Sequence, residues 1–242
     1  MIKSISFIIP YFNEKKRILH CLKQIKKFQN NRIRSEFIFV DDGSNDGTDI
    51  LIKNFKKNNK NININIISYK KNMGKGFALK LGVLNAEYEW ILTTDIDMSV
   101  SLKQILIWIK KKFIKKSFYI YFGSREHKDS IVRTAFHRKF LGKIFRIFIN
   151  FFLKILIKDT QCGFKLYKKF IAKKIFKKLT INKFEHDLEI VLNAQKINKP
   201  IVELPVRWSH KKNSKLNIFI DSFKMLLGII LLRYRWKNIN KN

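Results

Sequence analysis

Short hydrophobic runs alternate with longer amphipathic segments along the N-terminal part of the chain. The runs are typical of buried strands and cover residues 5–9, 36–40, 62–68 and 90–94. The intervening segments repeat hydrophobic residues at helical spacing, over residues 15–28, 49–58 and 77–86. This alternation predicts an α/β fold with a Rossmann-like, mostly parallel sheet flanked by helices.

Polar residues gather where the predicted strands end, and ligands of such sheets bind beyond the carboxyl ends of the strands. After the first two strands, the candidate binding residues are Pro10, Asn13, Glu14, Asp41 and Asp42. The first turn offers an amide and a carboxylate that can bind a base or a sugar edge. The acids of the second turn can accept hydrogen bonds from a base or a ribose. A helix cap and an Asx-turn are the local alternatives.

A small basic turn, from Asn72 to Gly76, precedes the third predicted helix. Its glycines let the backbone approach a phosphate, and Lys75 adds positive charge. The spacing is not that of a full P-loop, so the turn indicates phosphate binding only weakly.

Asp95 and Asp97 follow the fourth predicted strand and are separated by one residue. Alternate carboxylates on extended chain can approach one divalent cation and leave positions open for diphosphate oxygens. Neither His nor Cys lies nearby in the sequence, which favours Mg²⁺ or Mn²⁺ over zinc. A capped turn is the alternative.

The chain carries 51 Lys and Arg against 18 Asp and Glu, a formal net charge of +33. Such an excess can serve nucleic-acid binding or attraction to an anionic membrane surface. The lysines are spread along a chain that also abounds in Ile, Asn and Phe, a bias that an AT-rich genome produces by itself. No recognition element gathers them, so nucleic-acid binding is the weaker interpretation.

Two apolar stretches interrupted by charged residues cover residues 140–157 and 216–236. The charges argue against membrane-spanning helices and favour basic amphipathic helices at the membrane interface. Residues 211–242 are predicted to form a basic amphipathic C-terminal tail. Burial of the apolar faces against the sheet is the alternative.

The two cysteines, Cys21 and Cys162, lie far apart and form neither a metal-ligand spacing nor a disulfide framework. This usage fits a reducing cytoplasm. The chain enters its first strand with no room for a signal peptide or an N-terminal anchor. We therefore expect a peripheral protein at the cytoplasmic face of a membrane.

Taken in order, these motifs resemble the inverting glycosyltransferases of family 2. The matching segments are Ile9-Pro10-Tyr11-Phe12-Asn13-Glu14, Val40-Asp41-Asp42-Gly43-Ser44-x-Asp46-Gly47-Thr48, Asn72-x-Gly74-Lys75-Gly76, Asp95-x-Asp97 and Gly123-Ser124-Arg125. Residues 159–166 and Leu204-Pro205-Val206-x-Trp208 are similar to dolichyl-phosphate β-glucosyltransferases. The resemblance implies a GT-A fold over residues 1–210, with a nucleotide-sugar-binding half at 1–100 and an acceptor-binding half at 101–210.

The resemblance also implies a role for each matching residue. Nucleotide-sugar binding is implied for Pro10, Tyr11, Asn13, Glu14, Asp41, Asp42, Lys75 and Asp95. The implied metal ligands are Asp95 and Asp97, and the implied acceptor wall comprises Gln161, Cys162, Gly163, Phe164 and Lys165. The implied catalytic residues are Asp97, Asp187 and Arg125. Glu185-His186 replaces the aromatic approach to Asp187 that is usual in the family, and a surface cation is the alternative for Arg125.

The implied reaction is the inverting transfer of a hexose, glucose from UDP-glucose, to a polyprenyl phosphate such as dolichyl or undecaprenyl phosphate. Glucose over mannose rests on the resemblance alone. A phosphate monoester is already anionic at neutral pH, so its attack needs no strong general base. The alternatives are a family 2 enzyme acting on a cell-wall or exopolysaccharide acceptor and, more distantly, a basic nucleic-acid-binding protein.

Overall fold

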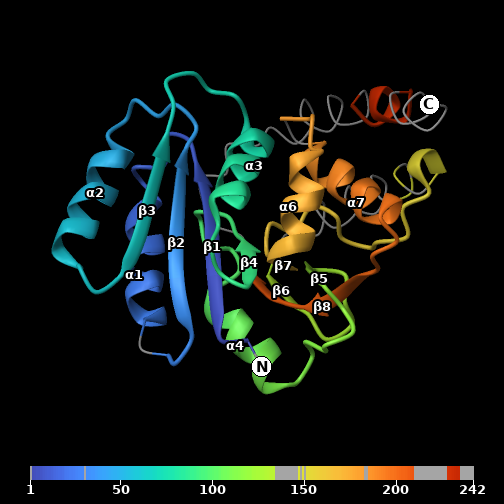
Figure 1. Ribbon diagram of the computed structural model, residues 1–242, viewed down its shortest axis with the longest axis horizontal. Coiled ribbons are helices and arrows are strands. Elements are labelled where there is room, and N and C mark those ends of the chain that lie inside the picture. Colours follow the sequence, from blue (N-terminus) through green and yellow to red (C-terminus); the bar gives the residue numbers. More distant parts are fainter. Residues whose placement is uncertain are drawn as a thin grey trace.

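Seven strands form the central sheet of the protein in a computed structural model (Figure 1). The structure describes residues 2–29, 31–133, 147, 149, 151–182, 185–209 and 228–234. The strands are β1 (Ser4–Tyr11), β2 (Arg34–Asp41), β3 (Asn63–Ser68), β4 (Trp90–Thr93), β5 (Ile120–Ser124), β6 (Ile131–Arg133), β7 (Lys165–Lys168), β8 (Ile201–Pro205) and β9 (Arg207–Ser209). The helices are α1 (Ile18–Phe28), α2 (Thr48–Asn58), α3 (Lys75–Asn85), α4 (Lys103–Lys110), α6 (Lys169–Lys177) and α7 (His186–Lys196). The sheet order is β3-β2-β1-β4-β7-β5-β8, and β6 pairs with β9 separately.

The N-terminal half of the sheet is parallel and enclosed. Strand β1 pairs with β2 and β4, and β2 pairs with β3, all in parallel. Every residue of β1 after Ser4 and of β2 after Arg34 is buried, as expected of strands covered on both faces. The predicted strands and helices of this half are confirmed, with shifts only at their ends.

One strand runs against its neighbours and brings distant segments together. Strand β7 is antiparallel to both β4 and β5, whereas β5 and β8 are parallel, so the sheet is mixed. Lys165 begins β7 and is paired with Thr93, the last residue of β4. The segment before β7 therefore meets the loop after β4, which carries Asp95.

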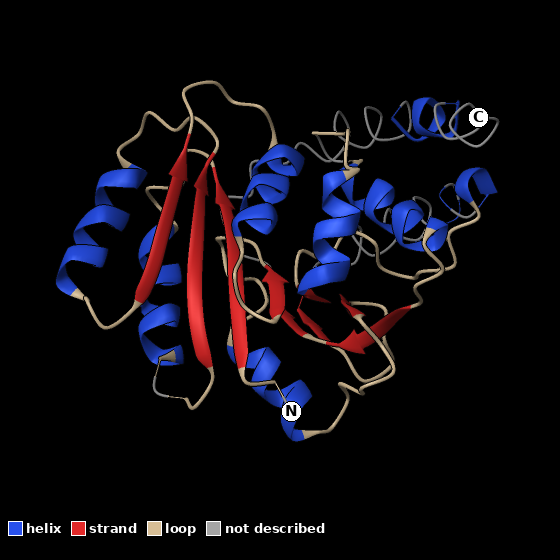
Figure 2. Ribbon diagram, in the orientation of Figure 1, coloured by secondary structure: helices blue, strands red, loops and turns tan. Residues whose placement is uncertain are grey.

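Helices pack on the two faces of the sheet (Figure 2), and one hydrophobic core lies on each face. The first core packs α1, α2 and α4 on one face, with Trp108 of α4 fully buried. The second packs α3, α6 and α7 on the other face, around side chains such as Val83 and Phe176. The helices on both faces hold the strand ends, and so the loops that follow them, in fixed positions.

Parts of the two basic apolar stretches pack on the second core. Their buried side chains are Ile149, Leu153, Ile155, Ile229 and Leu232. Arg233 lies over the ring of Phe152, 5.5 Å from its centroid, so the two stretches contact each other. The predicted alternative of burial is thus confirmed for these five side chains.

The same stretches also expose apolar side chains. These are Ile147, Phe151, Leu156, Ile230, Leu231 and Tyr234. The helical part of the first stretch ends at Leu153, so the prediction of a helix to residue 157 is wrong; Lys154 takes the left-handed conformation that breaks it (φ 54°). The other parts of 140–157, 211–242 and 216–236 lie outside the described residues. Of the helices in the described ranges, none is long and apolar enough to cross a membrane.

Gly82 allows α3 to lie close to the centre of the sheet. An ideal Cβ at this position would overlap Ile8 Cγ2 and lie 3.0 Å from Val40 Cγ2. At a solvent-exposed helix position, alanine stabilises the helix by about 1 kcal/mol relative to glycine, but overpacking of a core contact destabilises the fold by about 1–3 kcal/mol.

We therefore expect Gly82→Ala to lower the free energy of unfolding by about 1 kcal/mol, measured by urea denaturation. Lys57→Ala, at an exposed position of α2, is the control and should change it little. A Gly82→Ala protein more stable than the parent would contradict the close contact.

Candidate active site

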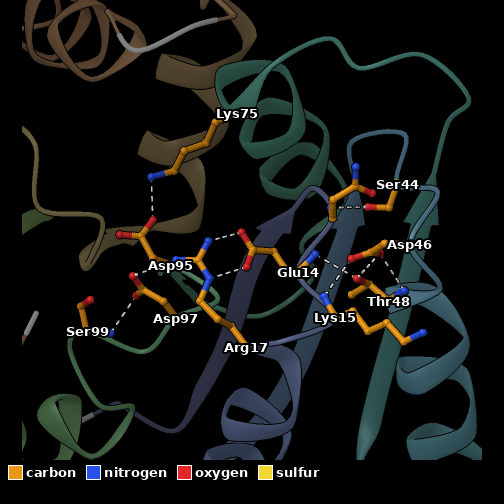
Figure 3. Close-up of polar contacts among 11 residues, drawn as sticks. Glu14, Lys15, Arg17, Ser44, Asp46, Thr48, Lys75, Asp95, Asp97 and Ser99 are labelled. Atoms are coloured by element: carbon orange, nitrogen blue, oxygen red, sulfur yellow. Dashed lines mark hydrogen bonds and ion pairs between the residues drawn. The ribbon is translucent and has the colours of Figure 1, made fainter. Parts of the chain in front are cut away.

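Two carboxylates in the loop after β4 each face a positively charged side chain (Figure 3). Lys75 Nζ lies 2.6 Å from Asp95 Oδ1, and Arg17 Nη1 lies 3.7 Å from Asp97 Oδ2. Asp97 also accepts a hydrogen bond from the amide of Ser99 at 2.9 Å. The side chains of Asp95 and Asp97 are 38% and 22% exposed, so a ligand can reach both.

Hydrogen bonds tie the loop after β1 to the loop after β2. The backbone amide of Glu14 donates to Thr48 Oγ1 at 2.9 Å, and the backbone amide of Asn13 donates to Ser44 Oγ at 3.0 Å. Asn13 Oδ1 accepts in turn from the amide of Asn45 at 2.8 Å. The two loops therefore form one rim beside Asp95 and Asp97 (Figure 3).

Arg17 joins this rim to the acids of the loop after β4. Its guanidinium donates to both carboxylate oxygens of Glu14 and also faces Asp97. The carboxylate of Glu14 is buried and fully engaged in this pair. Glu14 therefore orients the cation that faces Asp97.

Pro10, Tyr11 and Asp41 lie buried beneath the rim. Asp41 Oδ1 accepts a hydrogen bond from the amide of Ser44 at 2.8 Å. The ring of Tyr11 packs edge-to-face on Phe39, with centroids 6.3 Å apart. Burial, followed by the negative charge of Asp41, raises the pKa of the Tyr11 phenol. These three predicted nucleotide-binding residues support the rim from below instead of projecting from it.

Asp42 holds the glycine turn before α3. Its Oδ1 accepts hydrogen bonds from the amides of Met73 at 2.7 Å and Gly74 at 3.1 Å. The amide of Gly76 donates to the carbonyl of Asn182 at 2.8 Å. These amides are thus engaged within the protein, which corrects the expectation that the backbone of this turn cradles a phosphate. The turn offers a ligand the side chain of Lys75 instead.

Gly163 brings the predicted acceptor segment against Asp95. An ideal Cβ at Gly163 would lie 2.6 Å from Asp95 Cγ, so only glycine fits beside this carboxylate. Thr93 Oγ1 fixes the approach by donating to the carbonyl of Gly163 at 3.0 Å. The residues predicted to bind the donor and those predicted to bind the acceptor therefore share one wall.

Arg125 and Asp159 form a bidentate ion pair beside this wall. Arg125 Nε and Nη2 donate to the two carboxylate oxygens of Asp159 at 2.7 and 2.8 Å. The guanidinium also lies 5.7 Å from the ring centroid of Trp208. Burial opposes the ionisation of Asp159, but the charge of Arg125 and its hydrogen bonds hold the pKa of this carboxyl below its ordinary value. Arg125 is thus a fixed part of the site and not a mobile surface cation.

Lys165 and Asp187 form a second ion pair, which is buried beneath the same wall. Their side chains are 2% and 8% exposed, and Lys165 Nζ lies 4.7 Å from the ring centroid of Phe122. Burial opposes the ionisation of Asp187, but neighbouring basic groups hold its pKa below the ordinary value. The groups that lower it are His186, Lys165 and Lys75. Asp187 is therefore an anion that is already paired.

The other residues of the predicted acceptor wall differ in what they offer a ligand. Cys162 and Phe164 are buried, and Phe164 packs edge-to-face on Trp108 with centroids 5.2 Å apart. Burial raises the pKa of the Cys162 thiol to about 12, so it is not a nucleophile at neutral pH. Gln161 is half-buried, and its backbone amide donates to Asp159 Oδ1 at 3.2 Å.

A small pocket connects the two sides of the site. Its lining includes Lys75, Thr94, Asp95, Gly163, Lys165 and Asp187. In the part of the chain that the structure describes, no group of three or more His, Cys, Asp or Glu side chains could hold a metal ion. Asp95 and Asp97 would therefore need oxygen atoms from a bound molecule or water to complete a cation site.

Three residues of the site were not predicted from sequence. Tyr69 donates from its hydroxyl to Asp42 at 2.9 Å, and nothing in its surroundings in the sequence marks it. Arg17 is one of 51 basic residues, and only its spacing of three from Glu14 hints at a pair. Asp159 lies in the segment that carries the family resemblance, but its bond to Arg125 depends on the fold.

Comparison with known proteins matches residues 6–176 to the model of Glycosyl transferase family 2. The chain is 35% identical over 243 residues to the dolichyl-phosphate beta-glucosyltransferase of Dictyostelium discoideum, covering 96% of this chain and 74% of that protein. It is 29% identical over 252 residues to the dolichyl-phosphate beta-glucosyltransferase of Mus musculus, covering 97% and 76%.

Among solved structures, the chain is similar to glucosyl-3-phosphoglycerate synthase from Mycobacterium tuberculosis. The complex of that enzyme with Mn²⁺, UDP and phosphoglyceric acid gives a TM-score of 0.71 at 13% identity, covering 96% of this chain and 78% of that one. Its complex with Mn²⁺ and UDP-glucose gives a TM-score of 0.68 at 13% identity, covering 96% and 79%. This likeness confirms the predicted α/β, GT-A fold.

The Arg125–Asp159 pair makes stability depend on pH. The pKa of Asp159 in the folded protein lies below its ordinary value of 3.8. The pair therefore stabilises the fold fully above about pH 5, and this stabilisation is lost as the pH falls through the folded-state pKa.

We expect Asp159→Asn to lower the free energy of unfolding at neutral pH by about 3 kcal/mol, measured by urea denaturation. The difference from the parent protein should shrink at about pH 3. The control is Asp129→Asn, since the Asp129 side chain is 60% exposed. An equal loss for Asp159→Asn at both pH values would contradict the lowered pKa.

Proposed function

We propose that this chain, which belongs to glycosyl transferase family 2, transfers glucose from UDP-glucose to a polyprenyl phosphate of the dolichyl type. The chain is a glycosyltransferase, and the relatives it matches over most of its length are dolichyl-phosphate beta-glucosyltransferases. The observation that carries the proposal is the contact between Asp95 and Gly163. It joins the acids expected at the donor diphosphate to the segment expected at the acceptor.

The donor diphosphate would bind where Asp95 and Asp97 face Lys75 and Arg17. Carboxylate oxygens suit Mg²⁺ or Mn²⁺, and both acids are partly exposed and already turned toward cations, so they fit such an ion. The glucosyl-3-phosphoglycerate synthase complexes with Mn²⁺ and UDP or UDP-glucose support this assignment. A bound ion would neutralise negative charge on the leaving diphosphate.

The chain's own residues would orient these charges. Glu14 holds Arg17 toward Asp97, and Asp42 holds the turn from which Lys75 projects. Groups fixed before the substrate arrives need little rearrangement when charge develops on the leaving diphosphate. The rim formed by the loops after β1 and β2 is the proposed seat of the nucleoside.

The acceptor phosphate would approach along the wall formed by Gly163, where Arg125 presents a cation fixed by Asp159. A phosphate monoester has a second pKa of about 6, so it carries nucleophilic oxygen without losing a proton to the protein. One direct displacement by that oxygen inverts the anomeric carbon.

The state of Asp187 favours a phosphate over a hydroxyl acceptor. A hydroxyl of a cell-wall or exopolysaccharide glycan would need a general base to remove its proton. Asp187 is buried and paired with Lys165, with its pKa held low, so it is a weak base. Its proposed role is to balance the charge of Lys165 beneath the acceptor.

Attachment to an anionic membrane surface is the second part of the proposal. The two apolar stretches contact each other through Arg233 and Phe152, and each exposes apolar side chains next to buried ones. A net charge of +33 adds attraction to anionic lipids. Peripheral binding at the cytoplasmic face would place the acceptor's phosphate within reach of the site.

Removal of one carboxylate tests the donor site. We expect Asp97→Ala to reduce the transfer of labelled glucose from UDP-glucose to dolichyl phosphate at least about a hundredfold, because the divalent cation that would neutralise the diphosphate would lose one of its two carboxylate ligands. Asp129→Ala removes an exposed carboxylate and is the matched control. Undiminished turnover of Asp97→Ala would refute the assignment of Asp97 to the metal site. Transfer only from GDP-mannose would refute UDP-glucose as the donor.

Charged substitutions test the membrane surface. Phe151 is 74% exposed and Leu231 is 60% exposed, and we expect Phe151→Asp and Leu231→Asp each to weaken binding to phosphatidylserine-containing vesicles about tenfold. Co-sedimentation measures this binding. Leu19→Asp, at a 56% exposed position of α1, changes the charge equally and should leave binding close to that of the parent. Equal effects at all three positions would leave charge alone as the cause and contradict the proposed surface.

A further inference from the structure

Both acids of the proposed metal site are occupied by cations that belong to the protein itself. Lys75 enters from the start of α3 and reaches Asp95 at 2.6 Å, while Arg17 enters from the turn before α1 and faces Asp97 at 3.7 Å (Figure 3). The two pairs differ in strength, because only Lys75 is within hydrogen-bond distance of its acid. A divalent cation that approaches Asp95 therefore meets an ammonium group first.

The Lys75–Asp95 pair is built into the fold on both sides. The turn before Lys75 is held by the hydrogen bond from Gly74 to Asp42, and Gly163 packs directly against the Asp95 carboxylate. These contacts fix the turn that carries Lys75 and the carboxylate of Asp95, so the Lys75 side chain is the part of the pair that can move. The pair is thus a defined structural element and not a chance contact of a long side chain.

Lys75 is influenced by two further acids besides Asp95. Asp187 and Asp97 both interact with its charge, and Lys75 in turn helps to hold the pKa of Asp187 low. Lys75 and Asp187 also line the same pocket. The ammonium group can therefore leave Asp95 and keep a negatively charged neighbour.

We propose that Lys75 is the resident counter-cation of Asp95, and that a divalent metal must displace it, so that the metal binds together with the nucleotide diphosphate and not before it. This inference rests on the proposed function of the site. A metal ion and an ammonium group on one carboxylate repel each other. Two carboxylates alone also supply too few ligands for tight binding.

The nucleotide diphosphate removes both obstacles. Its oxygens complete the coordination of the cation, and its remaining negative charge gives Lys75 and Arg17 new partners. Free protein would therefore bind the metal weakly, and bound UDP would strengthen that binding. Lys75 would set the size of this coupling between metal and nucleotide.

The test is a titration of the full-length protein with Mn²⁺, with free Mn²⁺ followed by electron paramagnetic resonance, without and with UDP. We expect Lys75→Met to bind Mn²⁺ at least about tenfold more tightly than the parent when UDP is absent. The ratio of the affinities with and without UDP should fall by a similar factor. Lys75→Arg keeps the positive charge and should resemble the parent protein.

The matched control is Lys26→Met, which removes a charge from an exposed position of α1. If Lys75→Met does not fold, as judged by circular dichroism, Lys75→Gln removes the same charge and keeps a hydrogen-bond donor toward Asp95. Mn²⁺ affinity in the charge-removing variants Lys75→Met and Lys75→Gln equal to that of the parent, or equal to that of Lys26→Met, would overturn the inference.

This outcome can be separated from failure of the proposed function. A parent protein that shows the predicted Mn²⁺ shifts but transfers no glucose to dolichyl phosphate would refute the proposed acceptor and leave the role of Lys75 standing. If the parent protein transfers glucose to dolichyl phosphate but Lys75→Met binds Mn²⁺ no more tightly than the parent, only the role of Lys75 is refuted.

Discussion

The antiparallel pairing of β7 with β4 is the constraint on which the site depends. It places Lys165 opposite Thr93, so the chain that enters β7 meets the chain that leaves β4. Gly163 then fits against Asp95, where any larger residue would overlap the carboxylate. A parallel β7 would have carried this segment to the opposite edge of the sheet, far from Asp95.

Positive charge in this protein is abundant, but in the site it is placed by carboxylates. Glu14 orients Arg17, Asp159 orients Arg125, and Asp187 is paired with buried Lys165. Each cation is held by an acid that also limits its movement, which favours binding of anions in one geometry. The few acids of the chain thus orient the basic side chains of the site, whereas the other basic residues contribute only to the overall positive charge.

The parallel half of the fold follows from sequence because its strands are continuous hydrophobic runs and its helices have clear periodicity. The carboxylates of the loop after β4 were equally predictable, since they stand at a strand end. Sequence could not reveal that Arg17 would contact Asp97, or that Arg125 would contact Asp159, because these contacts join separate loops. The role of Asp42 was also hidden, because a hydrogen bond to the backbone of a distant turn leaves no trace in residue spacing.

The C-terminal segment contacts the chain next to the start of α7. Gly228 packs so closely on Glu185 that an ideal Cβ would lie 2.5 Å from the Glu185 carboxyl carbon, and Asp187 lies only two residues further along. A bilayer that holds Leu231 would therefore set the height of Asp187 above the lipid headgroups. The phosphate of a lipid carrier sits at that headgroup level whatever the length of its chain. The depth at which the protein rests, and not the number of isoprene units in the lipid, would then decide whether the phosphate reaches the wall formed by Gly163.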